Sequence, residues 1–184
     1  LKGQKVELKR PSDAIRQGIA YVTEDRKGEG LVLPMSIAHN TTLPSMKEFS
    51  SKVFIRSGAE KKRTNEILSE LKVKMASPRL AVKNLSGGNQ QKVVLAKWMM
   101  KDPDLIIFGE PTRGIDVGAK AEIYKLMNEF VAKGKAVIMI SSEMPEAMGM
   151  SDRILVISNH RLSGELSREE FSQDVIMKMA MRYM

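Results

Sequence analysis

The 184-residue sequence contains no cysteine, which excludes disulfide bonds and thiolate metal sites. Its apolar runs are the length of a strand, well short of the roughly 20 residues that a membrane-spanning helix requires. The opening stretch LKGQKVELKR carries too many charges for the apolar part of a signal peptide. We therefore expect a soluble protein of a reducing compartment, and the leucine at position 1 predicts that the chain was cut from something longer.

Aromatic residues are also scarce, at 5% of the chain, whereas basic residues outnumber acidic ones by 30 to 22 and give a net charge of +8. A basic protein can bind nucleic acid or an anionic membrane surface. Here the basic residues are scattered, and no interleaved aromatic residues form a platform on which bases could stack. We therefore expect no nucleic-acid partner, and we interpret the charge as a solvated surface that faces a membrane partner.

The hydrophobic pattern predicts an α/β fold in one domain, with a parallel crossover unit in its second half and a mostly helical middle part at about residues 45–100. Predicted strands cover residues 1–8, 19–23, 105–108, 136–140 and 153–157, with a hairpin partner at 161–166. One predicted helix starts at Pro11. The others cover residues 36–42, 59–71, 117–131, 144–150 and 169–181.

One short motif stands out in the helical part. The sequence LSGGNQQ at residues 85–91 puts a serine and two glycines at the start of an apolar-faced helix. Unpaired N–H groups and the positive end of the helix dipole meet at such a start, and glycine lets an anion approach the backbone. The motif therefore predicts a phosphate-binding corner, while an ordinary loop that ends in a serine cap remains the alternative.

A second motif follows a strand. The apolar run LIIF at 105–108 leads into GEPTRGID at 109–116, which puts the carboxylate of Glu110 at the end of a strand. Functional residues gather at the carboxyl ends of parallel strands. Glu110 is therefore a candidate functional residue, the alternative being a surface acid before a turn.

Taken together, LSGGNQQ, GEPTRGID and a later strand that ends in ISSE resemble the nucleotide-binding domain of the ATP-binding cassette (ABC) family. YVTEDRK at 21–27, EPTRGIDVGAK, SSEMPE and SDR at 151–153 are similar to the second of two fused cassettes in simple-sugar import ATPases. The resemblance implies a P-loop NTPase-like cassette over residues 1–184, with a mostly parallel sheet and a helical subdomain that carries the signature motif.

The resemblance also implies roles for individual residues. In the family, two cassettes meet head to tail, so Ser86, Gly87, Gly88 and Gln90 would cap an ATP molecule held mainly by the opposing cassette. Asp116 resembles the residue that communicates across this interface. A helix N-cap is an equally good interpretation of Asp116, and the two roles do not exclude each other.

At the hydrolysis site the resemblance is weaker. Glu110 and Ser142 stand at the family's catalytic positions, but many cassettes have a histidine where this chain has Ser142, and serine does not titrate near neutral pH. Glu24 occupies a nucleotide-contacting position where many cassettes have glutamine. Gly109 replaces the aspartate that directs Mg²⁺, so we assign no metal ligand to this chain and expect a degenerate hydrolysis site.

The phosphate-binding sequence G-x-x-x-x-G-K-[ST] is missing. At the single Gly-Lys pair, Gly134-Lys135, Glu129 stands where the first glycine should be and Ala136 follows the lysine. In the family that loop lies upstream of the matched region, so we expect it to precede Leu1. Without its backbone amides and lysine, the chain alone is expected to bind ATP weakly or not at all.

These observations predict the ATP-binding subunit of a monosaccharide importer, peripheral on the cytoplasmic face of the cell membrane. ATP and Mg²⁺ would be its cofactors. Its partners would be the other cassette, the transmembrane permease subunits and, indirectly, a sugar-binding protein, and an exposed sheet edge could cause self-association. Three alternatives remain: a fully catalytic half-site once the missing segment is supplied, a basic nucleic-acid-binding module, and a dimerisation domain with vestigial motifs.

Overall fold

The computed structural model describes residues 1–51 and 54–184. The chain divides into two compact units, Leu1–Ile138 and Met139–Met184, which are described separately. Within the described residues, no helix combines the length and apolar character needed to cross a membrane.

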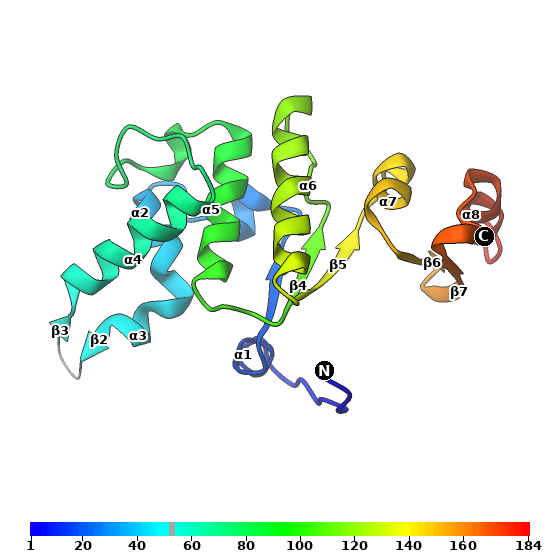
Figure 1. Cartoon of the computed structure of the whole chain (residues 1–184), viewed down its shortest axis with the longest axis horizontal. Coiled ribbons are helices and arrows are strands. Elements are labelled where there is room, and N and C mark those ends of the chain that lie inside the picture. The colour runs from blue at the N-terminus through cyan, green and yellow to red at the C-terminus, as the bar shows by residue number, and fades with distance from the viewer. Residues whose placement is uncertain (52–53) are drawn as a thin grey trace. The chain divides into compact units, whose positions relative to one another are not determined.

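A three-stranded sheet lies at the centre of the first unit, and its central strand β4 has β1 and β5 as neighbours (Figure 1). The strands are β1 (Ile19–Val22), β4 (Leu105–Gly109) and β5 (Ala136–Ile140), the last of which runs across the boundary between the units. β1 and β4 run parallel, with Val22 opposite Phe108. Ala20, Val22, Ile106 and Phe108 are buried. The predicted strands at 19–23, 105–108 and 136–140 are confirmed.

Two long helices, α5 (Gly87–Met99) and α6 (Val117–Ala132), lie side by side in Figure 1, and α5 also packs against β1. Residues 90–96 of α5 are buried on every side, so the helix is surrounded by other elements rather than lying on the surface. On α6, Ile123, Met127 and Phe130 form the buried stripe that the sequence predicts, but Val131 is exposed.

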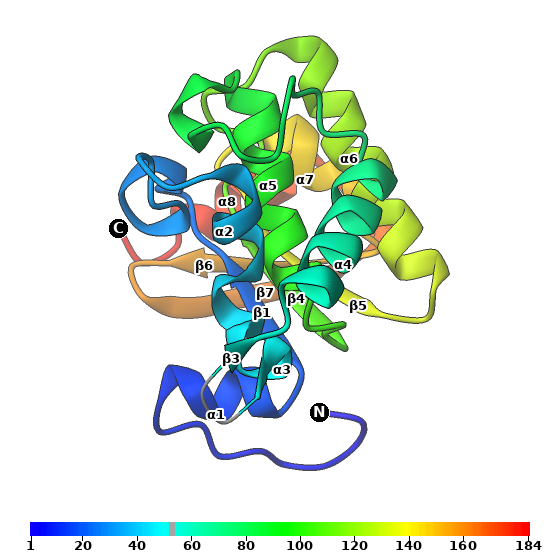
Figure 2. The same cartoon turned by 90° about the vertical axis from the view of Figure 1, so that its left-hand side faces the viewer.

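The helical part of the first unit brings α2, α4 and α5 together (Figure 2). Its elements are α2 (Ile37–Thr42), η2 (Leu43–Ser45), α3 (Met46–Phe49), β2 (Ser50–Ser51), β3 (Phe54–Ile55), α4 (Ser57–Glu70) and η3 (Val82–Asn84). Ile67, Leu68 and Leu71 are buried, as their spacing predicts. A separate helical subdomain at about 45–100 stays a prediction.

Lys92 connects three parts of the first unit from inside α5. Its side chain is only 5% exposed, and its Nζ lies 2.7 Å from a carboxylate oxygen of Glu122 on α6. The same ammonium group donates a hydrogen bond of 3.1 Å to the carbonyl of Lys72, directly after α4. The hydrogen bond from Lys92 is the main cause that lowers the pKa of Glu122. A buried ammonium needs such partners, because desolvating an unpaired charge is costly.

The start of the chain differs from the prediction. Residues 1–8 form no strand. Instead Lys2 and Gly3 have φ values of 50° and 75°, and the Gln4 amide donates to the Leu1 carbonyl across a turn. Leu8 is 44% exposed, and Leu1 and Val6 are only partly buried. The next predicted element does form, as α1 (Pro11–Arg16), and a π-helical turn, η1 (Arg26–Gly30), follows β1.

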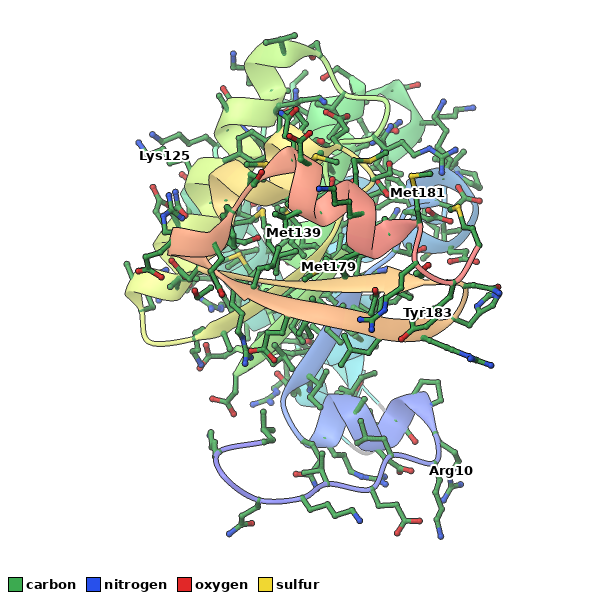
Figure 3. All side chains as sticks on the ribbon, turned by 90° about the vertical axis from the view of Figure 1, so that its right-hand side faces the viewer. Arg10, Lys125, Met139, Met179, Met181 and Tyr183 are labelled. Atoms are coloured by element: carbon green, nitrogen blue, oxygen red, sulfur yellow. The ribbon has the colours of Figure 1, made fainter. Side chains whose placement is uncertain are left out.

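The second unit consists of an antiparallel hairpin with a helix across it (Figure 3). Its elements are α7 (Met144–Met150), β6 (Arg153–Ser158), β7 (Arg161–Ser167), η4 (Arg168–Glu170) and α8 (Gln173–Ala180). Val156, Leu166 and Ile176 form its core. Met179, labelled in Figure 3, packs so closely on Gly164 that a Cβ there would lie 2.9 Å from its sulfur.

The predicted helix at 169–181 is shorter than expected. Glu170 accepts hydrogen bonds from both the amide and the hydroxyl of Ser167, which fixes a single 3₁₀ turn before the helix. Ser172 then serves as the N-cap of α8, so the helix begins only at Gln173. The hairpin and the helix at 144–150 are confirmed.

Candidate functional site

The LSGGNQQ segment, called the glycine corner below (residues 85–91), forms the start of α5. Ser86 occupies the N-cap position, but its hydroxyl makes no bond to a helix amide. It accepts a 2.9 Å hydrogen bond from Nδ2 of Asn89 instead, while the side-chain oxygen Oδ1 of Asn89 accepts a 2.7 Å hydrogen bond from the Lys74 amide. Within the described residues, the amides of Gly87 and Gly88 therefore have no protein acceptor. They remain available to an anion.

Close packing explains the two glycines. A Cβ on Gly88 would lie 2.7 Å from the Cβ of Ala119, so only glycine lets α5 approach α6 this closely. A Cβ on Gly87 would lie 3.2 Å from the Gly114 carbonyl and 3.3 Å from the Arg26 guanidinium. The glycine corner is thus held against the loop that follows β4 and against the turn that follows β1.

Gln90 lies inside the protein rather than at the surface. Its side chain donates to the buried Val82 carbonyl at 3.3 Å and accepts a 3.3 Å hydrogen bond from Nε of Arg26. Gln90 is 4% exposed, whereas Ser86 is exposed. Any effect of Gln90 on a bound nucleotide would therefore pass through Arg26. Burial lowers the pKa of Arg26.

Asp116 caps helix α6. One of its carboxylate oxygens accepts a 2.9 Å hydrogen bond from the Ala119 amide, and the residue is exposed. This confirms the N-cap interpretation. Because Ala119 also packs against Gly88, the cap fixes the position at which α6 meets the glycine corner. The role of Asp116 across an interface stays a prediction.

Glu24 forms an ion pair with Arg113, at 3.4 Å. The two side chains border an open cavity of about 430 Å³ together with Asp25, Arg26 and Lys27. Most of this lining belongs to the YVTEDRK motif, yet the sequence analysis selected only Glu24 from it. Arg26 and Arg113 were missed, although their place inside two of the quoted motifs was a usable signal.

Glu110 follows directly after β4 and has a φ of 44°, in the left-handed region. This region is unfavourable for a residue with a side chain, at a cost of about 1–2 kcal/mol. The carbonyl of Glu110 accepts a 3.1 Å hydrogen bond from the Arg113 amide, which closes the turn. Strained backbone of this kind is often found at functional sites. We call Gly109 and Glu110 the strand tip.

The strand tip does not suit Mg²⁺. In the described part of the chain, no three His, Cys, Asp or Glu side chains are grouped so that they could hold a metal ion. Mg²⁺ prefers oxygen ligands in a near-octahedral arrangement, and Gly109 offers no side-chain oxygen. The space beside Gly109 is taken by the hydroxyl of Tyr21.

Ser142 belongs to the second unit and is exposed. The neighbouring Ser141 hydroxyl accepts from the Glu143 amide at 3.0 Å and donates to the carboxylate of Glu146, which is buried. These bonds fix the turn that leads into α7. The other predicted site residues, Glu24, Ser86, Gly87, Gly88, Gln90, Glu110 and Asp116, all lie in the first unit.

A family model described as "ABC transporter" matches residues 1–113. The ribose import ATP-binding protein RbsA of Bacillus licheniformis is 52% identical over 98% of this chain, and that of Clostridium tetani is 50% identical over 100%. The xylose import ATP-binding protein XylG of Thermoanaerobacter pseudethanolicus is 54% identical over 98%. The chain spans 36% of the length of each of these relatives.

Solved structures agree with the fold. The dimeric ATP-binding cassette MJ0796, in a post-hydrolysis state with ADP and Pi, has a TM-score of 0.73 and 21% identity, covering 90% of this chain and 70% of that protein. The cassette MJ1267 also has a TM-score of 0.73, at 22% identity, with 92% of this chain and 67% of that protein covered. At this identity the likeness supports the fold alone.

Proposed function

The chain belongs to the ABC transporter family, and from this membership we propose that it is the ATP-binding cassette of a monosaccharide importer, with a glycine corner that closes on ATP held by an opposing cassette. Closure of the two cassettes around ATP drives the permease subunits between their two access states. Ribose and xylose appear in the names of the relatives, and these sugars define the substrate class.

One observation carries the proposal. At the glycine corner, the exposed Ser86 stands before two amides that have no acceptor within the described residues. The corner is also rigidly built, since Gly87 and Gly88 are packed against neighbouring backbone and side chains. A preformed group of donors at a helix start suits the terminal phosphate of ATP, whose negative charge the helix dipole favours.

The strand tip of the same chain contributes less to hydrolysis. Glu110 would orient the water, but Gly109 supplies no carboxylate, and in the described residues no group of three His, Cys, Asp or Glu side chains could hold Mg²⁺. Hydrolysis of the ATP capped by this chain therefore takes place with catalytic groups of the opposing cassette, and Mg²⁺ is bound mainly there. This chain acts chiefly in closing the dimer.

The assembly implied is membrane-associated. The cassette binds permease subunits at the cytoplasmic face of the cell membrane, and a sugar-binding protein acts on the same permease from the other side. The excess of basic residues suits this location, because the cytoplasmic leaflet carries negative charge. The identity of the sugar is set by the permease and the binding protein, not by the cassette.

Nucleotide-dependent association tests the proposal. The chain is mixed with the amino-terminal cassette of the same importer, in which a Glu-to-Gln change at the catalytic position prevents hydrolysis, and the mass of the mixture is measured by light scattering. With ATP the two should form a one-to-one complex, and without ATP they should stay apart. Ser86→Arg, which fills the corner, should abolish the complex.

Ser12→Arg is the matched control, because it adds the same charge at an exposed position in the first turn of α1. Its complex should form as with the unchanged chain. Calorimetry of the chain alone should detect weak ATP binding or none. A crystal structure with a triphosphate fully enclosed by one copy of the chain would contradict the capping role.

A further inference from the structure

The last residue of β4 is Gly109, and its backbone conformation does not require glycine. Its φ does not lie in the left-handed region, so any residue could adopt this conformation. Space is the constraint instead. A Cβ on Gly109 would lie 2.9 Å from the Tyr21 hydroxyl oxygen and 3.5 Å from Cε2 of the same ring. At 2.9 Å something must shift, and the group met here is the end of the half-exposed Tyr21 side chain.

The ring that fills this space comes from the neighbouring strand. Tyr21 lies on β1 opposite Ile107, two residues before Gly109 on β4. Its ring reaches forward along the sheet, so its hydroxyl lies at the carboxyl end of β4. There it is near the Glu24 amide, which a Cβ on Gly109 would approach to 3.4 Å. The Tyr21 side chain is half-exposed, so the hydroxyl lies at the rim of the sheet and not in the core.

We propose that Tyr21 and Gly109 form an exchanged pair, in which the tyrosine hydroxyl occupies the volume of a residue-109 side chain at the strand tip. The steric part of this inference depends on the geometry alone. Its chemical part rests on the proposed function: where a cassette would have a carboxylate that holds Mg²⁺, this one offers a neutral phenol.

The two groups differ in what they can bind. An ionised carboxylate accepts hydrogen bonds and is a preferred ligand of Mg²⁺, whereas a phenol is a neutral donor and acceptor. A phenol at the strand tip can donate to a phosphate oxygen or to a water molecule, but it does not replace a charged metal ligand. Tyr21 is therefore a specificity-determining residue, and an aspartate at position 109 is not enough to restore a metal site while Tyr21 remains.

Thermal melts of a double-mutant set test the steric part. Gly109→Ala should lower the melting temperature by about 3 °C, because its Cβ must displace the Tyr21 hydroxyl at the end of a half-exposed side chain. In the Tyr21→Phe background the same change should cost about 1 °C or less, since the oxygen that the Cβ meets is gone. Gly58→Ala, at a site with no atom within 4 Å, is the control and should not lower the melting temperature.

An equal loss in both backgrounds, or no loss in either, would overturn the exchanged pair. Such a result would leave the proposed function untouched, because these melts contain no nucleotide and no partner cassette.

Binding of Mn²⁺ tests the chemical part. In the full importer ATPase with ATP bound, the affinity of the second cassette for Mn²⁺ is measured by electron paramagnetic resonance. Gly109→Asp with Tyr21→Phe should bind at least about 10-fold tighter than either single variant. If Gly109→Asp alone gains as much, Tyr21 does not block the site. If the double variant shows no gain in Mn²⁺ affinity, Tyr21 does not exclude a metal ion from this site, even where the melts support the steric part of the proposal. Loss of ATP binding in the unchanged protein would instead contradict the proposed function.

Discussion

The glycine corner and the strand tip lie in the same unit but are built in different ways. At the glycine corner, packing against Ala119 requires a glycine at position 88, and the free amides follow from a helix start that no side chain caps. At the strand tip, Gly109 leaves a gap that a neighbouring tyrosine fills, and Glu110 holds a strained backbone conformation. The first region therefore presents two amides without an acceptor in the described residues, while the second presents a glycine and a tyrosine hydroxyl beside the carboxylate of Glu110.

Under the proposed function, this difference means that one chain keeps the region that caps one nucleotide while its region at the other nucleotide changes. In a head-to-tail pair of cassettes, the corner of one chain and the strand tip of the same chain face different nucleotides. A substitution in one region can therefore change the binding of one nucleotide without changing the binding of the other. The predictions below separate the two regions by the size of the effect that each should show.

The largest effect should come from the glycine corner. Ser86→Arg in the assembled importer should lower both ATPase rate and sugar uptake by about 10²-fold or more, because even a small displacement of the capping groups spoils the geometry of the shared site. Rates are compared with those of Ser12→Arg. Unchanged rates would show that the corner does not cap a nucleotide.

A stability change should separate packing from ligand binding at the same corner. Gly88→Ala should destabilise the chain by about 1–3 kcal/mol in urea unfolding, because its Cβ would overlap that of Ala119. Ala119→Gly in the same chain should recover part of the loss. Gly149→Ala, in open space on α7, serves as the control and should be neutral or stabilising. No recovery in the double variant would show that this contact does not explain Gly88.

A smaller loss of stability is expected at the ion pair between Lys92 of α5 and Glu122 of α6. Glu122→Gln should cost about 1 kcal/mol near pH 7, a value reduced because Glu122 is half-exposed and screened by solvent. The folded-state pKa of Glu122 is lowered, first by the hydrogen bond from Lys92. The carboxylate therefore adds stability above its unfolded pKa, and this contribution disappears as the pH falls through the folded value.

Urea unfolding at several pH values checks this sign. The difference in free energy of unfolding between the unchanged chain and Glu122→Gln should be widest near neutral pH and should narrow as the pH falls below about 4.3, the usual pKa of an unfolded glutamate. Glu129→Gln removes an exposed pair at 4.0 Å and should show almost no gap at any pH. A gap that grows on acidification would contradict the assignment.

The smallest effect is expected at the strand tip. With the opposing cassette intact, Glu110→Gln should change the ATPase rate of the importer by less than about 3-fold. A working catalytic base would instead contribute about 10²–10⁴ in rate. A fall of that size, measured as phosphate release, would mean that the second site hydrolyses ATP and would remove the contrast between the two regions.

Much of the fold could be predicted because its elements depend on local patterns. The strands at 105–108 and 136–140 and the helix between them follow from apolar runs and stripes, and the structure contains all three. The predicted strand at 1–8 was wrong, because a turn with positive φ at Lys2 and Gly3 interrupts the extended backbone that a strand needs. The predicted helix at 169–181 was too long, because the bonds between Ser167 and Glu170 set a separate turn.

The site was only partly predictable for a different reason. Motif reading located the glycine corner, Glu24, Glu110 and Asp116, but it could not tell that Gln90 is buried. Nor could it find the partners of these residues, since Arg26 meets Gln90 across 64 positions of sequence. Tyr21 lies 88 positions before Gly109, and only the pairing of β1 with β4 brings their ends together.

The buried ammonium of Lys92 has a consequence for how the first unit responds to force. The same ammonium group is bonded to the end of α4 and to the side of α6, so a tilt of α5 would strain both contacts at once. A fluorescent label on α4 would test whether binding at the start of α5 changes the surroundings of α4.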